Sequence, residues 1–156
     1  MSNWITACKR GFIGGSVASV VSTAALAALG KREAGSAYGP TNAISHWFHG
    51  DKAALQDGPS MKYTLTGFAI HHGSSLFWAV LFERFLGKVL DRNEPLTTLE
   101  VGAAAAAAAC FTDYQLTPRR LHPGYEMRLS KPSLAVVYAT FGVGLALGAM
   151  LCRRKS

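Results

Sequence analysis

Four long stretches of the chain are apolar almost without interruption, and polar segments separate them. They are residues 11–30, 63–86, 97–116 and 132–152. A helix of a soluble protein carries a polar face, whereas these stretches carry hydrophobic or small side chains all round. Each is close to the roughly 20 residues that an α-helix needs to cross a bilayer. The pattern predicts an all-α integral membrane protein, a four-helix bundle that forms a single domain over residues 1–156.

The first connection, residues 31–62, is long, and Gly-Pro pairs interrupt it. Within it, residues 41–49 have a helical pattern, because three large apolar side chains fall on one face: Ile44, Trp47 and Phe48. A short helix with Trp and Phe on one side suits the membrane–water interface. We therefore expect a short interfacial helix in this loop.

Two histidines of that segment, His46 and His49, lie three residues apart and so share a helix face. This spacing can bind a metal ion. No acidic or cysteine side chain shares the face with them, however. The pattern favours two solvated histidines over a metal site.

The chain has few charged residues, and most of them are basic. Charged residues make up 16% of the sequence, and the net charge is +7. The basic residues gather at the ends of the four apolar stretches, where they can contact anionic lipid headgroups. We expect the bilayer to be one partner. No segment combines a basic face with aromatic or groove-reading elements, so the charge does not indicate nucleic-acid binding.

Four crossings place both termini on one side of the membrane. The 16 Lys and Arg residues divide equally between the two sides, so the positive-inside rule does not orient the protein. We expect cytoplasmic termini because Arg153, Arg154 and Lys155 adjoin a crossing, whereas Lys52 is remote from one.

The first apolar stretch also has features of a secretory leader, with basic residues before it and small residues near its end. We expect it to be retained as a helix. The apolar run is longer than the core of a usual leader, and Lys31 and Arg32 follow it at once.

Small residues recur every four positions on the first and last stretches. Such rows let helices approach closely in lipid, where packing drives association. The packing residues that we predict are Gly11, Gly15, Ser19, Thr140, Gly144 and Gly148. The rows are longer than the interior of one bundle needs, so we predict self-association into a homo-oligomer or binding to a membrane partner subunit.

Two adjacent histidines, His71 and His72, interrupt the second apolar stretch. Ionisable groups inside a membrane are costly and often mark a functional site. Ser75, one turn further on, offers a hydroxyl, and Asp113 lies near the end of the antiparallel third stretch. A hydrogen bond from a histidine to Asp113 is sterically possible. The candidate intramembrane polar site is therefore His71, His72, Ser75 and Asp113.

Several functions remain open for this cluster. The histidines can serve structure alone, through hydrogen bonds inside the bundle. They can build a proton or small-solute path with Asp113, or bind a metal or haem, for which a second copy would supply the facing ligand. No nucleophile elbow, phosphate loop or zinc-protease motif is present, so we assign no catalytic residue and do not favour an enzyme.

The sequence thus favours a structural or partner-binding role in the bilayer. A transport or proton-path function, or a metal- or haem-binding subunit, is the alternative and would use His71, His72 and Asp113. The sequence identifies no cofactor or metal, and we expect none.

The order of the segments resembles that of a family of small bacterial inner-membrane proteins of unknown function with four spans. The shared features are a Gly-rich first helix (Gly11–Gly15), a second helix with His and Ser that ends in an acid (His71–Glu83), and a Leu-Thr-Pro at the end of the third (Leu116 to Pro118). The resemblance is one of layout. It implies four spans and an inner-membrane location, and it implies no activity.

Overall fold

The computed structural model describes residues 1–154 and contains no strand within that range. Lys155, one of the basic residues considered above, lies outside the described part. Four long helices are α1 (Trp4–Ala34), α4 (Thr66–Leu90), α5 (Pro95–Phe111) and α6 (Lys131–Arg153). The π-helical turns Met61–Leu65 and Thr112–Leu116 extend α4 at its start and α5 at its end. All four helices are long and apolar enough to cross a membrane.

These helices extend beyond the apolar stretches that predicted them. The carboxamide of Asn3 accepts a hydrogen bond from the backbone N–H of Thr6 (2.8 Å) and so caps the start of α1. The helix continues through Lys9 and Arg10, because long basic side chains can extend away from an apolar backbone. It ends at Gly35, whose φ of 70° is left-handed.

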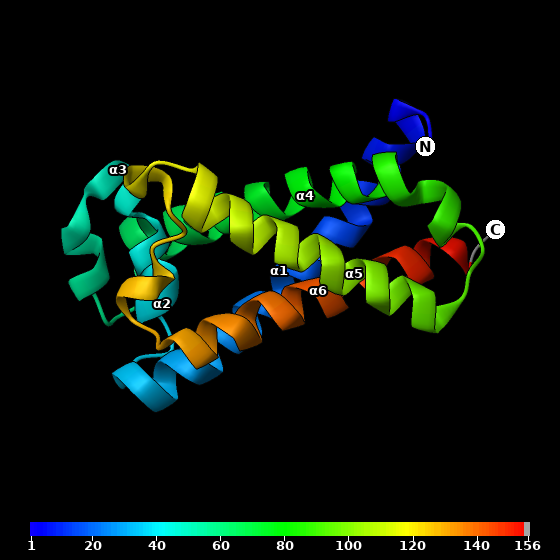
Figure 1. Ribbon diagram of the computed structural model, residues 1–156. Coiled ribbons are helices and arrows are strands. Elements are labelled where there is room, and N and C mark those ends of the chain that lie inside the picture. The colour runs from blue at the N-terminus through cyan, green and yellow to red at the C-terminus, as the bar shows by residue number, and fades with distance from the viewer. Residues whose placement is uncertain (155–156) are drawn as a thin grey trace.

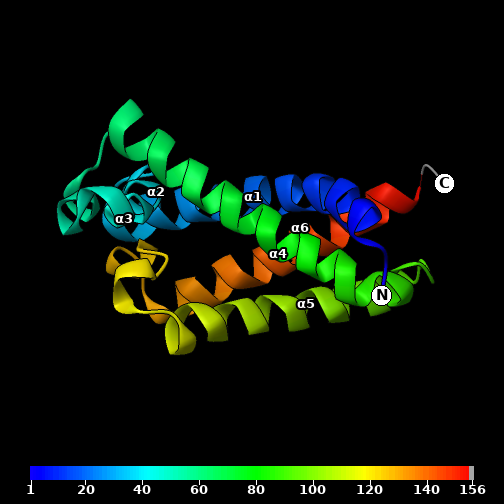
Figure 2. The same cartoon turned by 90° about the horizontal axis from the view of Figure 1, so that it is seen from above.

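The four long helices pack in the order α4, α1, α6, α5. Helices α1 and α6 form the centre, α4 packs on α1, and α5 packs on α6. Figure 2 shows α6 between α1 and α5. The outer helices α4 and α5 contact one another much less than each contacts its inner neighbour.

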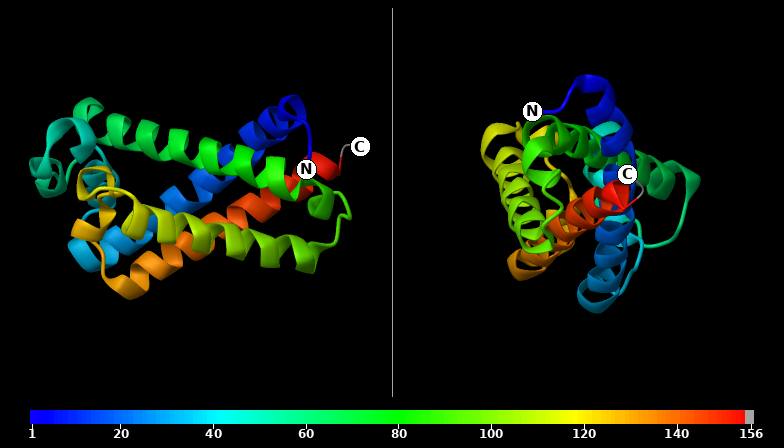
Figure 3. Two further views of the ribbon diagram at one scale, coloured as in Figure 1. Left: turned by 45° about the horizontal axis from the view of Figure 1, so that its top comes forward. Right: turned by 90° about the vertical axis from the view of Figure 1, so that its right-hand side faces the viewer.

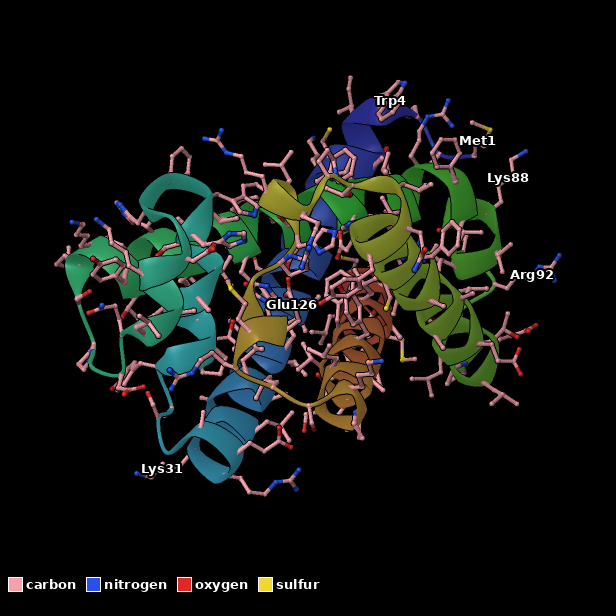
Figure 4. All side chains as sticks on the ribbon, turned by 60° about the vertical axis from the view of Figure 1, so that its left-hand side comes forward. Met1, Trp4, Lys31, Lys88, Arg92 and Glu126 are labelled. Carbon is pink, nitrogen blue, oxygen red and sulfur yellow. The ribbon has the colours of Figure 1, made fainter. Side chains whose placement is uncertain are left out.

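Both termini lie at one end of the bundle, beside the short turn between α4 and α5 (Figure 1 and Figure 3). The two long connections lie together at the other end. Figure 4 shows the same division, with Met1, Trp4, Lys88 and Arg92 near the terminal end and Lys31 at the far end. We call these the terminal end and the loop end.

The small residues of α1 and α6 bring helices of the same chain together. A Cβ atom on Gly11 or Gly15 of α1 would lie 2.7 Å from the backbone of α4. A Cβ on Gly144 of α6 would lie 2.5 Å from Cα of Ala18, and one on Gly148 would overlap α1 as well. The predicted rows therefore serve contacts within the chain.

Two further predicted packing residues behave differently from the glycines. Ser19 is fully buried, while Thr140 is only half-buried and donates to the carbonyl of Val137 on its own helix (2.8 Å). The sequence did not single out Gly102 and Gly142, where α5 and α6 approach so closely that a Cβ on either would meet the other's carbonyl oxygen. Self-association stays a prediction, and these rows no longer support it.

The loop after α1 differs from the single short interfacial helix over residues 41–49 that we predicted. It forms two short helices, α2 (Gly39–Ile44) and α3 (His46–His49). All of α2 is buried, and it packs so closely on α4 that a Cβ on Gly67 would overlap the carbonyl oxygen of Thr41. The predicted apolar face is also divided, since Ile44 is buried whereas Phe48 is 73% exposed.

A fully buried asparagine fixes the rest of this loop. The Asn42 amide donates to the carbonyls of Gln56 and Gly58 (2.9 Å each), and its oxygen accepts from the Thr64 hydroxyl (2.6 Å). The remaining short elements are 3₁₀ turns at Asp51–Leu55, Arg119–Leu121 and Tyr125–Met127. The loop end is thus a folded cap over the four long helices.

Candidate functional site

A cavity of about 250 Å³ lies at the loop end, where α4 and α5 diverge. Helices α4, α5 and α6 form its walls, and residues of α2, α3 and the 117–130 connection close it above. We call it the pocket. Its aromatic lining comprises Trp47, Phe77, Trp78, Tyr125, Tyr138 and Phe141. Its polar lining comprises His71, Ser74, Ser75, Thr112, Asp113 and Thr117.

Asp113 is the one acidic side chain of the pocket lining, and no Lys or Arg of the described chain lines the cavity with it. Its Oδ2 accepts a hydrogen bond from the hydroxyl of Tyr138 on α6 (2.5 Å). Among the described residues its Oδ1 has no hydrogen-bond donor. The carboxyl group therefore has one oxygen held in place and one free to bind a ligand.

His71 connects α4 to α1. Its Nε2 lies 2.8 Å from the hydroxyl of Ser22, which itself donates to the carbonyl of Ala18 (2.7 Å). Because a hydroxyl has a single proton, we assign the hydrogen of this contact to Nε2. Nδ1 is then an acceptor. The Ser75 hydroxyl donates to the His71 carbonyl (2.8 Å).

The structure divides the candidate polar site that the sequence predicted. His71, Ser75 and Asp113 line one pocket, but His72 is not part of it. The His72 ring stacks on Phe68 (centroids 5.7 Å apart), and its Nδ1 is buried without a partner in residues 1–154. The possible histidine–Asp113 hydrogen bond is not formed, because Tyr138 holds Asp113 and Ser22 holds His71.

The cap over the pocket is held by one carbonyl group. The oxygen of His122 accepts from His46 Nε2 (2.9 Å) and from Trp47 Nε1 (2.8 Å), which fixes α3 to the 117–130 connection. The prediction of two solvated histidines is therefore wrong for His46, which is buried. His49 is half-buried and packs edge-on against Tyr63.

Glu126, labelled in Figure 4, closes the other side of the cap. Its Oε2 accepts from the backbone N–H of Gly124 (2.7 Å) and from the Tyr114 hydroxyl (3.4 Å). Gly124 has a φ of 96°, and a Cβ there would lie 2.6 Å from the carbonyl oxygen of Ala43. Only glycine suits both conditions, so this turn can lie directly against α2.

A shallow groove adjoins the pocket on the outside of α4. It is lined by Trp47, Phe48, Ala69, Ile70, Gly73, Ser74 and Phe77, four of which also line the pocket. Gly73 faces open space, and Phe77 is largely exposed. The pocket is only partly enclosed, and it adjoins the outer surface between α3 and α4 through these shared side chains.

A second polar cluster lies at the terminal end and was not predicted. The guanidinium of Arg153 forms two parallel bonds with Glu83, of 2.9 and 3.0 Å, and also lies 3.0 Å from Asp91. Asp91 binds Arg10 as well (2.7 Å). Glu83 is only 2% exposed, because the bundle brings the last turn of α6 directly beside it.

The charges of this cluster act on Asp91, which lies just after α4. Partial burial acts to raise its pKa, but the hydrogen bond from Arg10 and the charge of Arg153 outweigh it and hold the pKa below the usual 3.8. Asp91 is therefore ionised at neutral pH and joins the two arginines. The cluster is a structural tie between α1, α4 and α6.

The chemistry of the pocket suits binding better than covalent catalysis. The contact between Ser22 and His71 is not arranged as a nucleophile–base pair, because the Ser22 hydroxyl donates to the Ala18 carbonyl and Ser22 does not line the pocket. Within residues 1–154, no three His, Cys, Asp or Glu side chains are grouped as a metal site. Comparison with protein-family models, curated proteins and solved structures finds no match for this chain.

Proposed function

We propose that this chain is a multi-pass membrane protein that binds a small organic ligand in the pocket. This departs from the structural or partner-binding role that the sequence favours. It is nearer to the alternative, a transport or proton-path function or a metal- or haem-binding subunit that uses His71, His72 and Asp113. One observation carries the proposal: an apolar, aromatic-lined cavity contains a carboxyl group with a free oxygen. A concave apolar site with a few converging polar groups is the usual form of a ligand site.

The outer surface of the bundle supports insertion into a bilayer. Large apolar side chains project from all four long helices, among them Phe12, Phe77, Phe111 and Leu147. At most half of each apolar segment is buried inside the protein. A surface of this kind is unfavourable in water and favourable in lipid. The bacterial inner membrane and cytoplasmic termini remain part of the proposal.

The interior histidine retains a structural role in this proposal. His71 joins α4 to α1 through Ser22, which is what the structural interpretation of the histidine pair anticipates. A partner-binding function stays a prediction. So does self-association, which the molar mass of the protein by light scattering in mild detergent tests.

Tryptophan fluorescence can test the binding proposal. Trp47 and Trp78 line the pocket, and Trp4 lies at the terminal end. We would titrate the protein in lipid nanodiscs with three probes of similar size: neopentylbenzene, benzyltrimethylammonium and phenylmethanesulfonate. At least one should change the fluorescence saturably.

A matched pair of variants locates the binding. Ser74→Phe places a ring in the pocket and should abolish the saturable signal. Ala108→Phe adds the same ring on the exposed face of α5 and should leave the signal unchanged. The proposal fails if no probe binds saturably, or if both variants bind as the wild type does.

A further inference from the structure

We infer that the ligand of the pocket is a lipophilic organic cation, such as an ammonium group with an apolar body. This inference rests on the proposed function. It assigns the cationic group to Asp113 and the apolar body to the aromatic lining. Three independent properties of the site support it: its charge, its aromatic lining and its position next to the outer surface.

The charge of the pocket favours a cation. Most side chains that line the pocket with Asp113 are apolar or aromatic. Glu126 and His122 lie near enough to act on its charge, but no lining Lys or Arg neutralises it. A carboxylate in such surroundings is costly unless a counter-charge is near. A bound cation would supply that charge at Oδ1, while Tyr138 keeps donating to Oδ2. An anionic ligand would add repulsion instead.

His71, the second ionisable side chain of the pocket lining, also favours a cationic or hydrogen-donating ligand. The Nε2 hydrogen of His71 is directed at Ser22, so the neutral imidazole leaves Nδ1 as an acceptor. The Ser75 hydroxyl is engaged with the His71 carbonyl. A ligand with a cationic or hydrogen-donating head therefore fits the polar side of the pocket better than one with an acceptor head.

The aromatic lining favours an ammonium over a metal cation. Six aromatic side chains line a cavity of about 250 Å³. The faces of Trp, Tyr and Phe attract organic cations, and the attraction grows when the cation is removed from water. A hard metal ion instead needs several oxygen ligands, and only one carboxylate is present here.

The position of the pocket favours a ligand that dissolves in lipid. The groove on the outside of α4 shares Trp47, Ile70, Ser74 and Phe77 with the pocket. The groove also contains the open surface at Gly73. The pocket is therefore partly open towards the outer surface of the bundle, which we expect to face lipid. A cation with an apolar body could reach Asp113 by this route without crossing the folded cap.

The test compares two probes that differ only in charge. Benzyltrimethylammonium and neopentylbenzene have the same shape, with a quaternary nitrogen in one and a quaternary carbon in the other. Both probes are added to wild-type protein, to Asp113→Asn and to Asp51→Asn, each in nanodiscs. Asp51→Asn is the control, because it removes a carboxylate from an exposed position away from the pocket. The wild type should bind the cation at least about tenfold more tightly than the neutral probe.

The two variants then test whether the preference for the cation depends on Asp113. Asp113→Asn should lower the affinity for the cation about tenfold or more and leave the neutral probe within about twofold. Asp51→Asn should change neither. The inference is overturned if the wild type binds the neutral probe as tightly as the cation, a comparison that needs no variant. It is also overturned if a folded Asp113→Asn protein keeps the preference.

The outcomes separate this inference from the proposed function. One outcome is that the neutral or anionic probe binds saturably, that Ser74→Phe abolishes this binding, and that the cation is not preferred. This outcome supports a ligand site in the pocket and rejects a cation as its ligand. Absence of saturable binding by all three probes rejects both.

Discussion

At the scale of single residues, the pair of Glu83 and Arg153 dominates the terminal end. Both side chains are buried, at 2% and 8% exposure, and two parallel hydrogen bonds join them. A buried ion pair adds little stability compared with apolar residues of the same size, because desolvation offsets the attraction. Removal of one partner is different, since it leaves a buried charge without a counter-charge.

Arg153→Leu should therefore lower the free energy of unfolding by about 3–5 kcal/mol, since Glu83 remains charged and unpaired. The double variant Glu83→Leu/Arg153→Leu should recover most of that loss. Thermal unfolding in detergent, followed by circular dichroism, measures both effects. Lys9→Leu, on the exposed side of α1, serves as the control for loss of a positive charge. A double variant that is no more stable than Arg153→Leu would contradict this account.

At the scale of helices, the contact between α1 and α6 depends on the absence of side chains. Gly144 lies against Ala18, and Gly148 against Gly14. Neither position can accept a side chain unless the two backbones separate. The same two helices form the centre of the bundle, so a small separation would disturb the packing of α4 and α5 as well.

Gly144→Leu should accordingly destabilise the folded chain by about 1–3 kcal/mol or more, through overpacking against α1. Gly73→Leu is the matched control, because Gly73 also lies within a long helix but faces open space. It should be neutral or slightly stabilising, since leucine favours a helix more than glycine does. Equal unfolding midpoints for the two variants would show that α1 and α6 are not in close contact.

At the scale of the whole molecule, the two ends of the bundle should face opposite sides of a membrane. The terminal end contains the first turns of α1 with Cys8 and the turn after α4 with Arg92. The loop end contains the 3₁₀ turns with Lys52 and Arg120, and all four residues are exposed. This arrangement follows from four crossings that alternate in direction. Single cysteines at these positions can test it directly.

In a background of Cys8→Ser, Cys110→Ala and Cys152→Ser, a cysteine is placed at 8, 52, 92 or 120 in turn. A maleimide that does not cross membranes, applied to sealed vesicles, should label 52 and 120 from one side. It should label 8 and 92 only from the other side. Labelling of 8 and 52 from the same side would disprove the four-span arrangement, whichever way the protein is oriented.

The sequence by itself determined the class and the number of the long helices. Apolar stretches of about 20 residues must form their hydrogen bonds internally, and in lipid only a helix does this within one segment. It also indicated Asp113 and His71 as unusual groups. The local pattern could not show that His72 lies apart from them. Adjacent residues of a helix point to different sides, and only the packing of the other helices decides which side faces the pocket.

The tertiary structure alone decided what each polar group contacts. Glu83 is buried because α6 ends beside it, and His46 is buried because the 117–130 connection folds over α3. The small-residue rows serve the chain itself because α1 and α6 lie at the centre of the bundle. The pocket exists because α4 and α5 pack on different inner helices and diverge at the loop end. Such contacts join residues far apart in the chain, and no periodicity along the sequence encodes them.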